Sequence, residues 1–204
     1  MSNHHLIITG TGRAGTTLLV QLLTELGLDT GFDGPHDGLF PNCDAGLETD
    51  LRGPDLAYVL KSPHFCDYLE EVLQQGLIID RAIVPMRDLY AAAQSRREVF
   101  RRTDSAHYPT QMPGGLWDTE PHTPEMQEAV LANKFYRLIH ALTMHDIPLT
   151  LLDFPRFVHE PDYLYRKLQC VLGDIGREQF LRAFQAVCRP EMVHDFPSLG
   201  KRGV

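Results

Sequence analysis

A short strand, a glycine-rich turn and a helix are predicted in immediate succession near the start of the chain. Residues Leu6–Thr9 form a mostly apolar run without alternation, as expected of a strand buried on both faces of a parallel sheet. Gly10–Gly15 form the turn, and leucines then recur at helical spacing over Thr16–Leu26, before Gly27. Because a parallel strand needs a crossover connection to its neighbour, this unit predicts an α/β fold.

The same alternation continues along the chain. Further strands are predicted at residues 57–60, 82–86 and 149–152, and helices at 66–75, 89–101, 123–145, 162–172 and 179–188. Residues 29–56 are rich in Gly, Pro and Asp and are predicted to be a connecting loop. Residues 103–123 are either a lid over an acceptor site or a disordered surface loop. We expect one domain over residues 1–204, a three-layer α/β/α fold with a mostly parallel central sheet.

Composition and charge exclude several classes of protein. The apolar fraction of 43% and the charged fraction of 23% are those of an ordinary soluble globule. A net charge of −8 argues against a general nucleic-acid binder, which needs clustered Lys and Arg, but allows a small anionic ligand. No apolar run reaches the ~18–20 residues of a membrane span, and the N-terminus has no signal-peptide pattern. We therefore expect a cytoplasmic protein.

Cysteines and histidines show no spacing typical of a metal site. The four cysteines are far apart and form no C-x-x-C pair, which favours reduced, structural thiols. His140 and His145 are five residues apart and would lie on different faces of a helix. We expect no metal centre.

The turn after the first strand has the frame of a phosphate-binding loop, G-x-x-x-x-G-x-[ST]. Thr16 stands where ATP and GTP loops carry a lysine. Backbone N–H groups at the helix N-terminus would still face an anion, and glycines permit the required backbone conformation. Arg13 lies at the crest of the loop. The alternative interpretation of the whole segment is a plain strand-to-helix turn that binds no ligand. The candidate binding residues are Gly12, Arg13, Ala14, Gly15, Thr16 and Thr17.

Two further groups follow predicted strands. Lys61-Ser62-Pro63-His64 comes after the strand at 57–60, and Arg87-Asp88 comes after the strand at 82–86, with Ser95 two helical turns later. Taken singly, these residues are better explained as a solvated strand-end lysine, a helix-capping aspartate and an ordinary surface serine. Ligands of open α/β sheets bind outside the carboxyl ends of the strands, so together with the loop these groups predict one anion site.

In this combination the chain resembles the sulfotransferase family, which has the P-loop nucleoside triphosphatase-like fold and binds 3′-phosphoadenosine 5′-phosphosulfate (PAPS). GTGRAGTTLL is similar to the family's phosphosulfate loop, with an arginine as in the tyrosylprotein and bacterial branches. VPMRDLYAAAQS resembles the 3′-phosphate motif R-D-x6-S, YVLKSPHF the K-[DS]-P segment, and AGLE the G-x-x-E segment. LTLLDFPRFVHEPDYLYRKLQCVLG is similar to a later strand, turn and helix. The resemblance runs from about residue 6 to 173 and weakens over residues 102–125.

The resemblance implies roles for several side chains. Arg87 and Ser95 would bind the 3′-phosphate of PAPS, and the product would be 3′,5′-ADP. Arg13 and Lys61 are placed to stabilise the bridging oxygen as the 5′-phosphate leaves, which accounts for the missing loop lysine. Glu48 is the first candidate for the general base, followed by His64 and His36. The acceptor would be a hydroxyl or amine of a small molecule, a carbohydrate or a lipid.

The chain also departs from the family pattern. Ser62 replaces an aspartate of the K-D-P segment, and its hydroxyl could take over the hydrogen bond that the aspartate would make. The family's basic R-K-G segment has no clear counterpart, because Lys201-Arg202-Gly203 lies at the extreme end and is interpreted as a solvated tail.

Two rival functions stay open. The first is a nucleotide or small-molecule kinase, since Leu77–Asp80 resembles a Walker-B strand; we interpret Asp80 instead as part of the turn that enters the strand at 82–86. The second is a relative that binds the nucleotide without catalysing a reaction.

Overall fold

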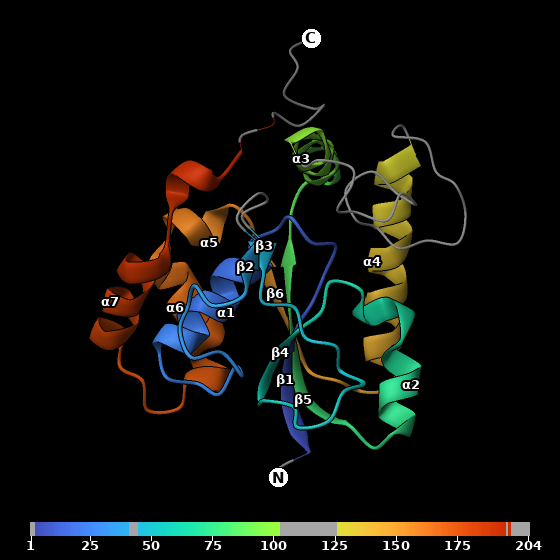
Figure 1. The fold of residues 1–204 in the computed structure, drawn as a ribbon, viewed down its shortest axis with the longest axis horizontal. Helices are drawn as coiled ribbons and strands as arrows, with labels where there is room; N and C mark the ends of the chain where they lie inside the picture. The colour runs from blue at the N-terminus through green and yellow to red at the C-terminus, as the bar shows by residue number, and fades with distance from the viewer. Residues whose placement is uncertain (1–2, 41–44, 103–125, 195, 197–204) are drawn as a thin grey trace.

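Four parallel strands form the central sheet, in the order β4-β1-β5-β6 (Figure 1). The computed structural model describes residues 3–40, 45–102, 126–194 and 196 of the 204-residue chain. The strands are β1 (His4–Ile8), β4 (Val59–Lys61), β5 (Ile78–Met86) and β6 (Leu149–Asp153). Since β1 lies between β4 and β5, the turn that follows it lies between the ends of both neighbours.

Helices cover both faces of the sheet, because its side chains alternate between two cores. Leu6 and Ile8 belong to one core and Ile7 to the other. The first core is closed by α1 (Thr16–Glu25), α5 (Arg156–His159), α6 (Pro161–Leu172) and α7 (Arg177–Val187). The second is closed by η1 (Phe65–Asp67), α2 (Leu69–Gln74) and α4 (Gln127–Met144). The prediction of helices on both sides of a parallel sheet is confirmed.

The carboxyl ends of the strands point toward α3 (Leu89–Arg102), which packs against α4 at that edge of the molecule (Figure 1). Ala92 and Ala93 of α3 meet Val130 and Leu131 of α4 in a small third core. The small alanine side chains allow the two helices to approach closely. Helix α3 also contacts the glycine-rich turn after β1, through Ser95 and Arg96.

Most predicted helices are found within two residues of their expected ends. The helix predicted at 66–75 divides into η1 and α2, whereas α5 and the short η4 (Pro190–Met192) were not predicted. The start of the helix predicted at 123–145 and the loop at 103–123 lie outside the described residues. Of the helices in the described ranges, none combines the length and apolar character that a membrane crossing requires.

The predicted loop at 29–56 contains a small antiparallel hairpin, β2 (Leu39–Phe40) with β3 (Ala45–Gly46). Two-residue strands carry no detectable alternation, which is why the sequence pattern did not reveal them. The hairpin leads the chain back toward β4, since the backbone N–H of Thr49 donates to the carbonyl of Lys61 at 2.8 Å.

Strand β5 corrects the interpretation of Asp80. The strand begins at Ile78 rather than Ala82, so Asp80 lies within it and not in a preceding turn. His5 pairs with Ile79 and Leu6 with Arg81, which leaves Asp80 as the extra residue of a bulge. Its carboxylate lies 2.6 Å from Nδ1 of His4, at the amino end of the sheet. Asp80 is therefore at the opposite end of the strands from the glycine-rich turn.

Pro85 lies in an interior strand, which its missing N–H normally forbids. Ile83 accepts a hydrogen bond from the N–H of Thr9, so Pro85, two residues later, faces the same neighbour. Strand β1 ends at Ile8, before that level, and a Cβ at Gly10 would lie 3.3 Å from the carbonyl oxygen of Pro85. The proline is tolerated because no ladder hydrogen bond is due there.

Candidate functional site

Three residues of the turn between β1 and α1 have a left-handed backbone conformation. Positive φ angles occur at Gly12 (67°), Arg13 (56°) and Gly15 (79°). Such left-handed residues turn successive N–H groups toward one concave side. Arg13 adopts this conformation although it has a Cβ, which costs about 1–2 kcal/mol. The loop is thus held in a conformation that local preference does not supply.

Helix α1 begins without a side-chain cap, because its N-cap residue is Gly15. The first N–H groups of a helix have no partner within the helix, so they are available to a ligand at this end. The first two helical residues, Thr16 and Thr17, carry hydroxyl groups at the same end. The turn and the first helical residues thus lie next to each other, as the sequence predicts, and anion binding there stays a prediction.

The structure brings Arg13, Ser95 and Arg87 together beside this loop. Nε of Arg13 donates to Oγ of Ser95 at 3.3 Å. Nη1 of Arg87 donates to the carbonyl oxygen of Arg13 at 2.9 Å. Since Arg87 follows β5 and Ser95 lies on α3, two separate elements position the crest of the loop. Residues taken from two separate sequence motifs thus lie side by side.

Arg87 also contacts the C-terminal part of the described chain. Its Nη2 donates to the carbonyl of His194, and its guanidinium lies 5.1 Å from the ring centre of Phe154 and 6.0 Å from that of Phe196. Both rings lie within the distance at which a cation attracts an aromatic face. The family's C-terminal basic segment cannot be compared, because Lys201-Arg202-Gly203 lies outside the described residues.

Arg96 belongs to the site although the sequence analysis missed it. It is 5% exposed, and its Nη2 donates to the carbonyl of Thr11 in the loop. Burial and the charge of Arg13 lower the pKa of Arg96 to about 9. A Cβ at Gly12 would lie only 2.7 Å from the Arg96 guanidinium, so Gly12 makes room for it. The sequence signal was slight, since Arg96 is one arginine in the run S-R-R on a helix.

A second group, the lysine cluster, joins Lys61, Thr17, Gly46 and Glu48. Nζ of Lys61 donates to Oγ1 of Thr17 at 2.8 Å and to the carbonyl of Gly46 at 2.5 Å. It also donates to Oε1 of Glu48 at 2.9 Å, in an ion pair where the lysine side chain is 2% exposed. Lys61 is thus a buried cation directly at the first turn of α1, not a solvated strand-end lysine.

His64 and Glu48 differ as candidate bases. Burial, with the nearby charges of Arg96 and Lys134, lowers the pKa of His64 to about 4. Its imidazole is therefore neutral at pH 7 and a weak proton acceptor. His36 is exposed, and its Nδ1 lies 3.3 Å from Nε2 of Gln21. Glu48 is the candidate base that directly contacts a cation of the site.

The lowered pKa of His64 gives a pH-dependent contribution to stability. An unfolded histidine binds a proton near pH 6.5 and the folded one only near pH 4, so stability is lost as pH falls through this window. Between pH 7.5 and pH 4, we expect the free energy of unfolding to fall less for His64→Gln than for the wild type, by up to about 3 kcal/mol. Urea unfolding at pH 7.5 and at about pH 4.5 measures this. An identical pH dependence of both proteins contradicts it.

Neighbouring polar residues have structural partners. Asp88 accepts a hydrogen bond from the N–H of Ala91 at 2.9 Å and so caps α3, which is the structural alternative considered for it. Oγ of Ser62 accepts from the hydroxyl of Tyr68 at 2.5 Å, a side-chain contact rather than a helix cap. Among the residues described, Cys66, Cys170 and Cys188 are free thiols.

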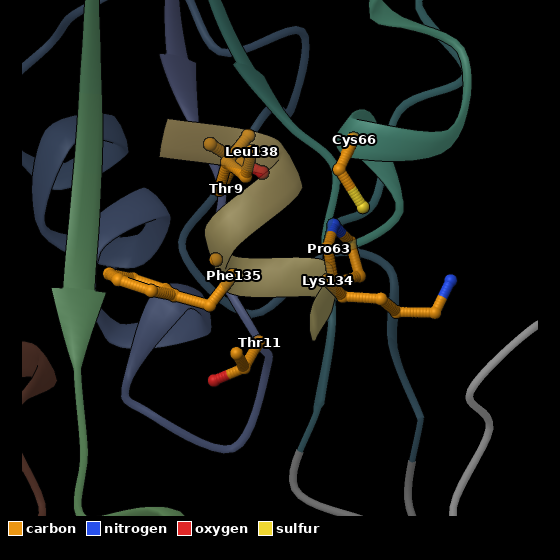
Figure 2. A pocket seen from close by; sticks show the side chains of 8 residues that line it. Thr9, Thr11, Pro63, Cys66, Lys134, Phe135 and Leu138 are labelled. Atoms are coloured by element: carbon orange, nitrogen blue, oxygen red, sulfur yellow. The ribbon is translucent and has the colours of Figure 1, made fainter. Parts of the chain in front are cut away.

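A small cavity lies behind the loop, with room for about one water molecule. Figure 2 shows Thr9 and Thr11 from the segment after β1, Pro63 from the turn after β4, Cys66 from η1, and three side chains of α4, Lys134, Phe135 and Leu138. The fully buried Oγ1 of Thr9 has no hydrogen-bond partner within the described ranges. This cavity is too small for a nucleotide, so it belongs to the packing of the loop against α4.

Comparison with known proteins gives no relative: the chain matches no protein-family model, no curated protein and no solved structure. Function is therefore inferred from the sequence motifs and the geometry of the site.

Proposed function

We propose that this protein is a sulfotransferase of the P-loop type, which transfers the sulfuryl group of PAPS to a hydroxyl or amine acceptor. The observation that carries the proposal is the meeting of two cation clusters at one glycine loop. Arg13, Ser95 and Arg87 contact one another at the crest of the loop, and Lys61 contacts the first turn of α1. A ligand with one anionic group in the loop and a second beside Arg87 fits this distribution of charge.

The charges and hydrogen-bond donors of these residues suit the anionic groups of PAPS. The uncapped N-terminus of α1 and the left-handed loop residues suit the 5′-phosphosulfate. Arg87 and Ser95, which both contact Arg13 at the loop crest, suit the 3′-phosphate. When bound, PAPS supplies an activated sulfuryl group whose bond to the 5′-phosphate oxygen breaks as the acceptor oxygen or nitrogen bonds to sulfur.

The chain's own groups then serve three tasks. Lys61 donates to the oxygen that keeps the electron pair of the broken bond, and Arg13 adds positive charge beside it. Glu48 takes the proton that the acceptor loses. The end of β4, the loop and the segment after the hairpin hold Lys61, Arg13 and Glu48 at one place, so the reacting groups start close together. A sulfuryl group carries less negative charge than a phosphoryl group, so the loop lysine of kinases is not required.

The position of Asp80 disfavours the kinase alternative. A Walker-B acid has to lie near the loop to hold Mg²⁺, whereas Asp80 is a bulged residue at the amino end of β5 and pairs with His4. A non-catalytic nucleotide-binding relative stays a second candidate, because it would keep the same cation clusters.

A transfer assay tests catalysis directly. The protein is incubated with PAPS carrying a labelled sulfuryl group and with phenol, amine and sugar acceptors in parallel, and both 3′,5′-ADP and labelled product are measured. We expect release of 3′,5′-ADP that depends on the acceptor and is lost in Lys61→Met. Release that is equal with and without every acceptor, or unaffected by Lys61→Met, contradicts the proposal.

A further inference from the structure

The three N–H donors of Lys61 face three acceptors within the lysine cluster. An ammonium group has three N–H donors, and here they meet Thr17 Oγ1, the Gly46 carbonyl and Glu48 Oε1 at 2.5–2.9 Å. With Lys61 2% exposed, water does not compete for these positions. Since these acceptors of the described residues already use the three N–H donors, a ligand oxygen in the loop can receive a hydrogen bond from Lys61 only if an acceptor is replaced.

Two of the acceptors are held in place. The Gly46 carbonyl belongs to the β2–β3 hairpin, where Gly46 pairs with Leu39. A Cβ at Gly46 would lie 2.3 Å from the carbonyl oxygen of Gly38, so the two strands of the hairpin pack closely and only glycine fits at this position. Thr17 lies in the first turn of α1 and moves only with the loop itself.

Glu48 is the acceptor that can leave. Its side chain is 36% exposed, so the carboxylate can regain water when it releases Lys61. The backbone on both sides is fixed, because Leu47 is buried at a φ of 64° and the N–H of Thr49 donates to the carbonyl of Lys61. A released Glu48 carboxylate therefore stays next to the lysine.

We propose that Glu48 and the anionic ligand compete for Lys61, an inference that rests on the proposed function. In the ligand-free protein Glu48 holds the ammonium. When an anionic oxygen enters the loop, Lys61 exchanges Glu48 for that oxygen, and the carboxylate is left beside the acceptor whose proton it takes. Ligand binding thus places the cation and releases the base in one movement of a side chain.

Competition between Glu48 and the ligand predicts in which direction the affinity changes when Glu48 is replaced. Glu48→Gln should bind 3′,5′-ADP about tenfold more tightly than the wild type, because a neutral amide holds an ammonium less strongly than a carboxylate does. Isothermal titration calorimetry measures the Kd of both proteins. If Glu48 merely orients Lys61 for the ligand, the same substitution leaves the affinity unchanged or weakens it, and the inference is wrong.

A double-mutant cycle separates exchange from simple repulsion. Removing a negative charge near an anion site tightens binding to some extent even if Lys61 never changes partner. Exchange through Lys61 requires the gain from Glu48→Gln to vanish in a Lys61→Met background, whereas repulsion alone preserves it. Lys61→Gln serves as the second background if Lys61→Met does not fold.

Two ligands, 3′,5′-ADP and inorganic pyrophosphate, distinguish a failure of this inference from a failure of the proposed function. Failure of 3′,5′-ADP to bind the wild type contradicts the proposed function, and the same cycle is then measured with inorganic pyrophosphate, which needs only the loop and Lys61. An approximately tenfold gain that depends on Lys61 supports the competition with either probe. A gain independent of Lys61, no gain, or no binding of either probe overturns it.

Discussion

Gly15→Ala is expected to lower the free energy of unfolding by about 3 kcal/mol, since two separate penalties add at this position. The backbone has a φ of 79°, a conformation that costs a residue with a Cβ about 1 kcal/mol. The new methyl group would also lie 2.7 Å from the ring of Phe157 and 2.9 Å from that of Phe154, which form part of the core against α1. Urea denaturation followed by circular dichroism measures the loss.

Gly27→Ala is the matched control, on the chain just after the same helix. Gly27 has a nearly equal φ of 83°, but apart from its two neighbours in the chain no described residue has an atom within 4 Å of the position that a methyl group would take there. We expect Gly27→Ala to lower the free energy of unfolding only by the cost of the left-handed backbone conformation, about 1 kcal/mol. Equal losses in the two variants would mean that the contact of Gly15 with the phenylalanines does not limit the position of α1.

Arg87→Ala is expected to weaken binding of 3′,5′-ADP about 100-fold and binding of 5′-AMP far less, since a charge-assisted contact to phosphate contributes up to about 3 kcal/mol. The difference arises because 5′-AMP lacks the 3′-phosphate that Arg87 is proposed to hold. Isothermal titration calorimetry with the two nucleotides measures the ratio of their dissociation constants.

The ratio matters because Arg87 also supports the loop. Its guanidinium donates to the carbonyls of Arg13 and His194, so its removal can disturb the site generally. Arg87→Lys retains the charge without the forked geometry and should recover part of the preference for 3′,5′-ADP. Equal losses of affinity for both nucleotides in Arg87→Ala would remove the role assigned to this residue.

The fold was largely predictable because its interior strands carry short apolar runs that are buried on both faces. Leu6–Ile8 of β1 and Ala82–Val84 of β5 are such runs, whereas β6 at the edge of the sheet alternates between buried and exposed side chains. The β2–β3 hairpin and the bulge at Asp80 were not predictable, because each depends on pairing with distant backbone and leaves no periodic pattern.

The site was predictable where residues follow strands, and not where tertiary contacts decide. Lys61 and Arg87 end or follow parallel strands, so the sheet alone brings them to one edge. Arg96 has the sequence context of a surface residue. It is buried because it donates to the loop, a tertiary contact that the sequence does not reveal. The contact of Arg87 with His194 likewise joins residues 107 positions apart.

A calorimetric titration of the wild-type protein with 3′,5′-ADP, ATP and ATP–Mg²⁺ tests the central claim most directly. A sulfotransferase site holds 3′,5′-ADP through the loop and the Arg87 and Ser95 side chains, whereas Asp80, the candidate Walker-B acid, lies at the far end of β5 from the loop. The proposed function predicts that 3′,5′-ADP binds and that ATP–Mg²⁺ binds much more weakly. Absence of 3′,5′-ADP binding, or tighter binding of ATP–Mg²⁺, would contradict it.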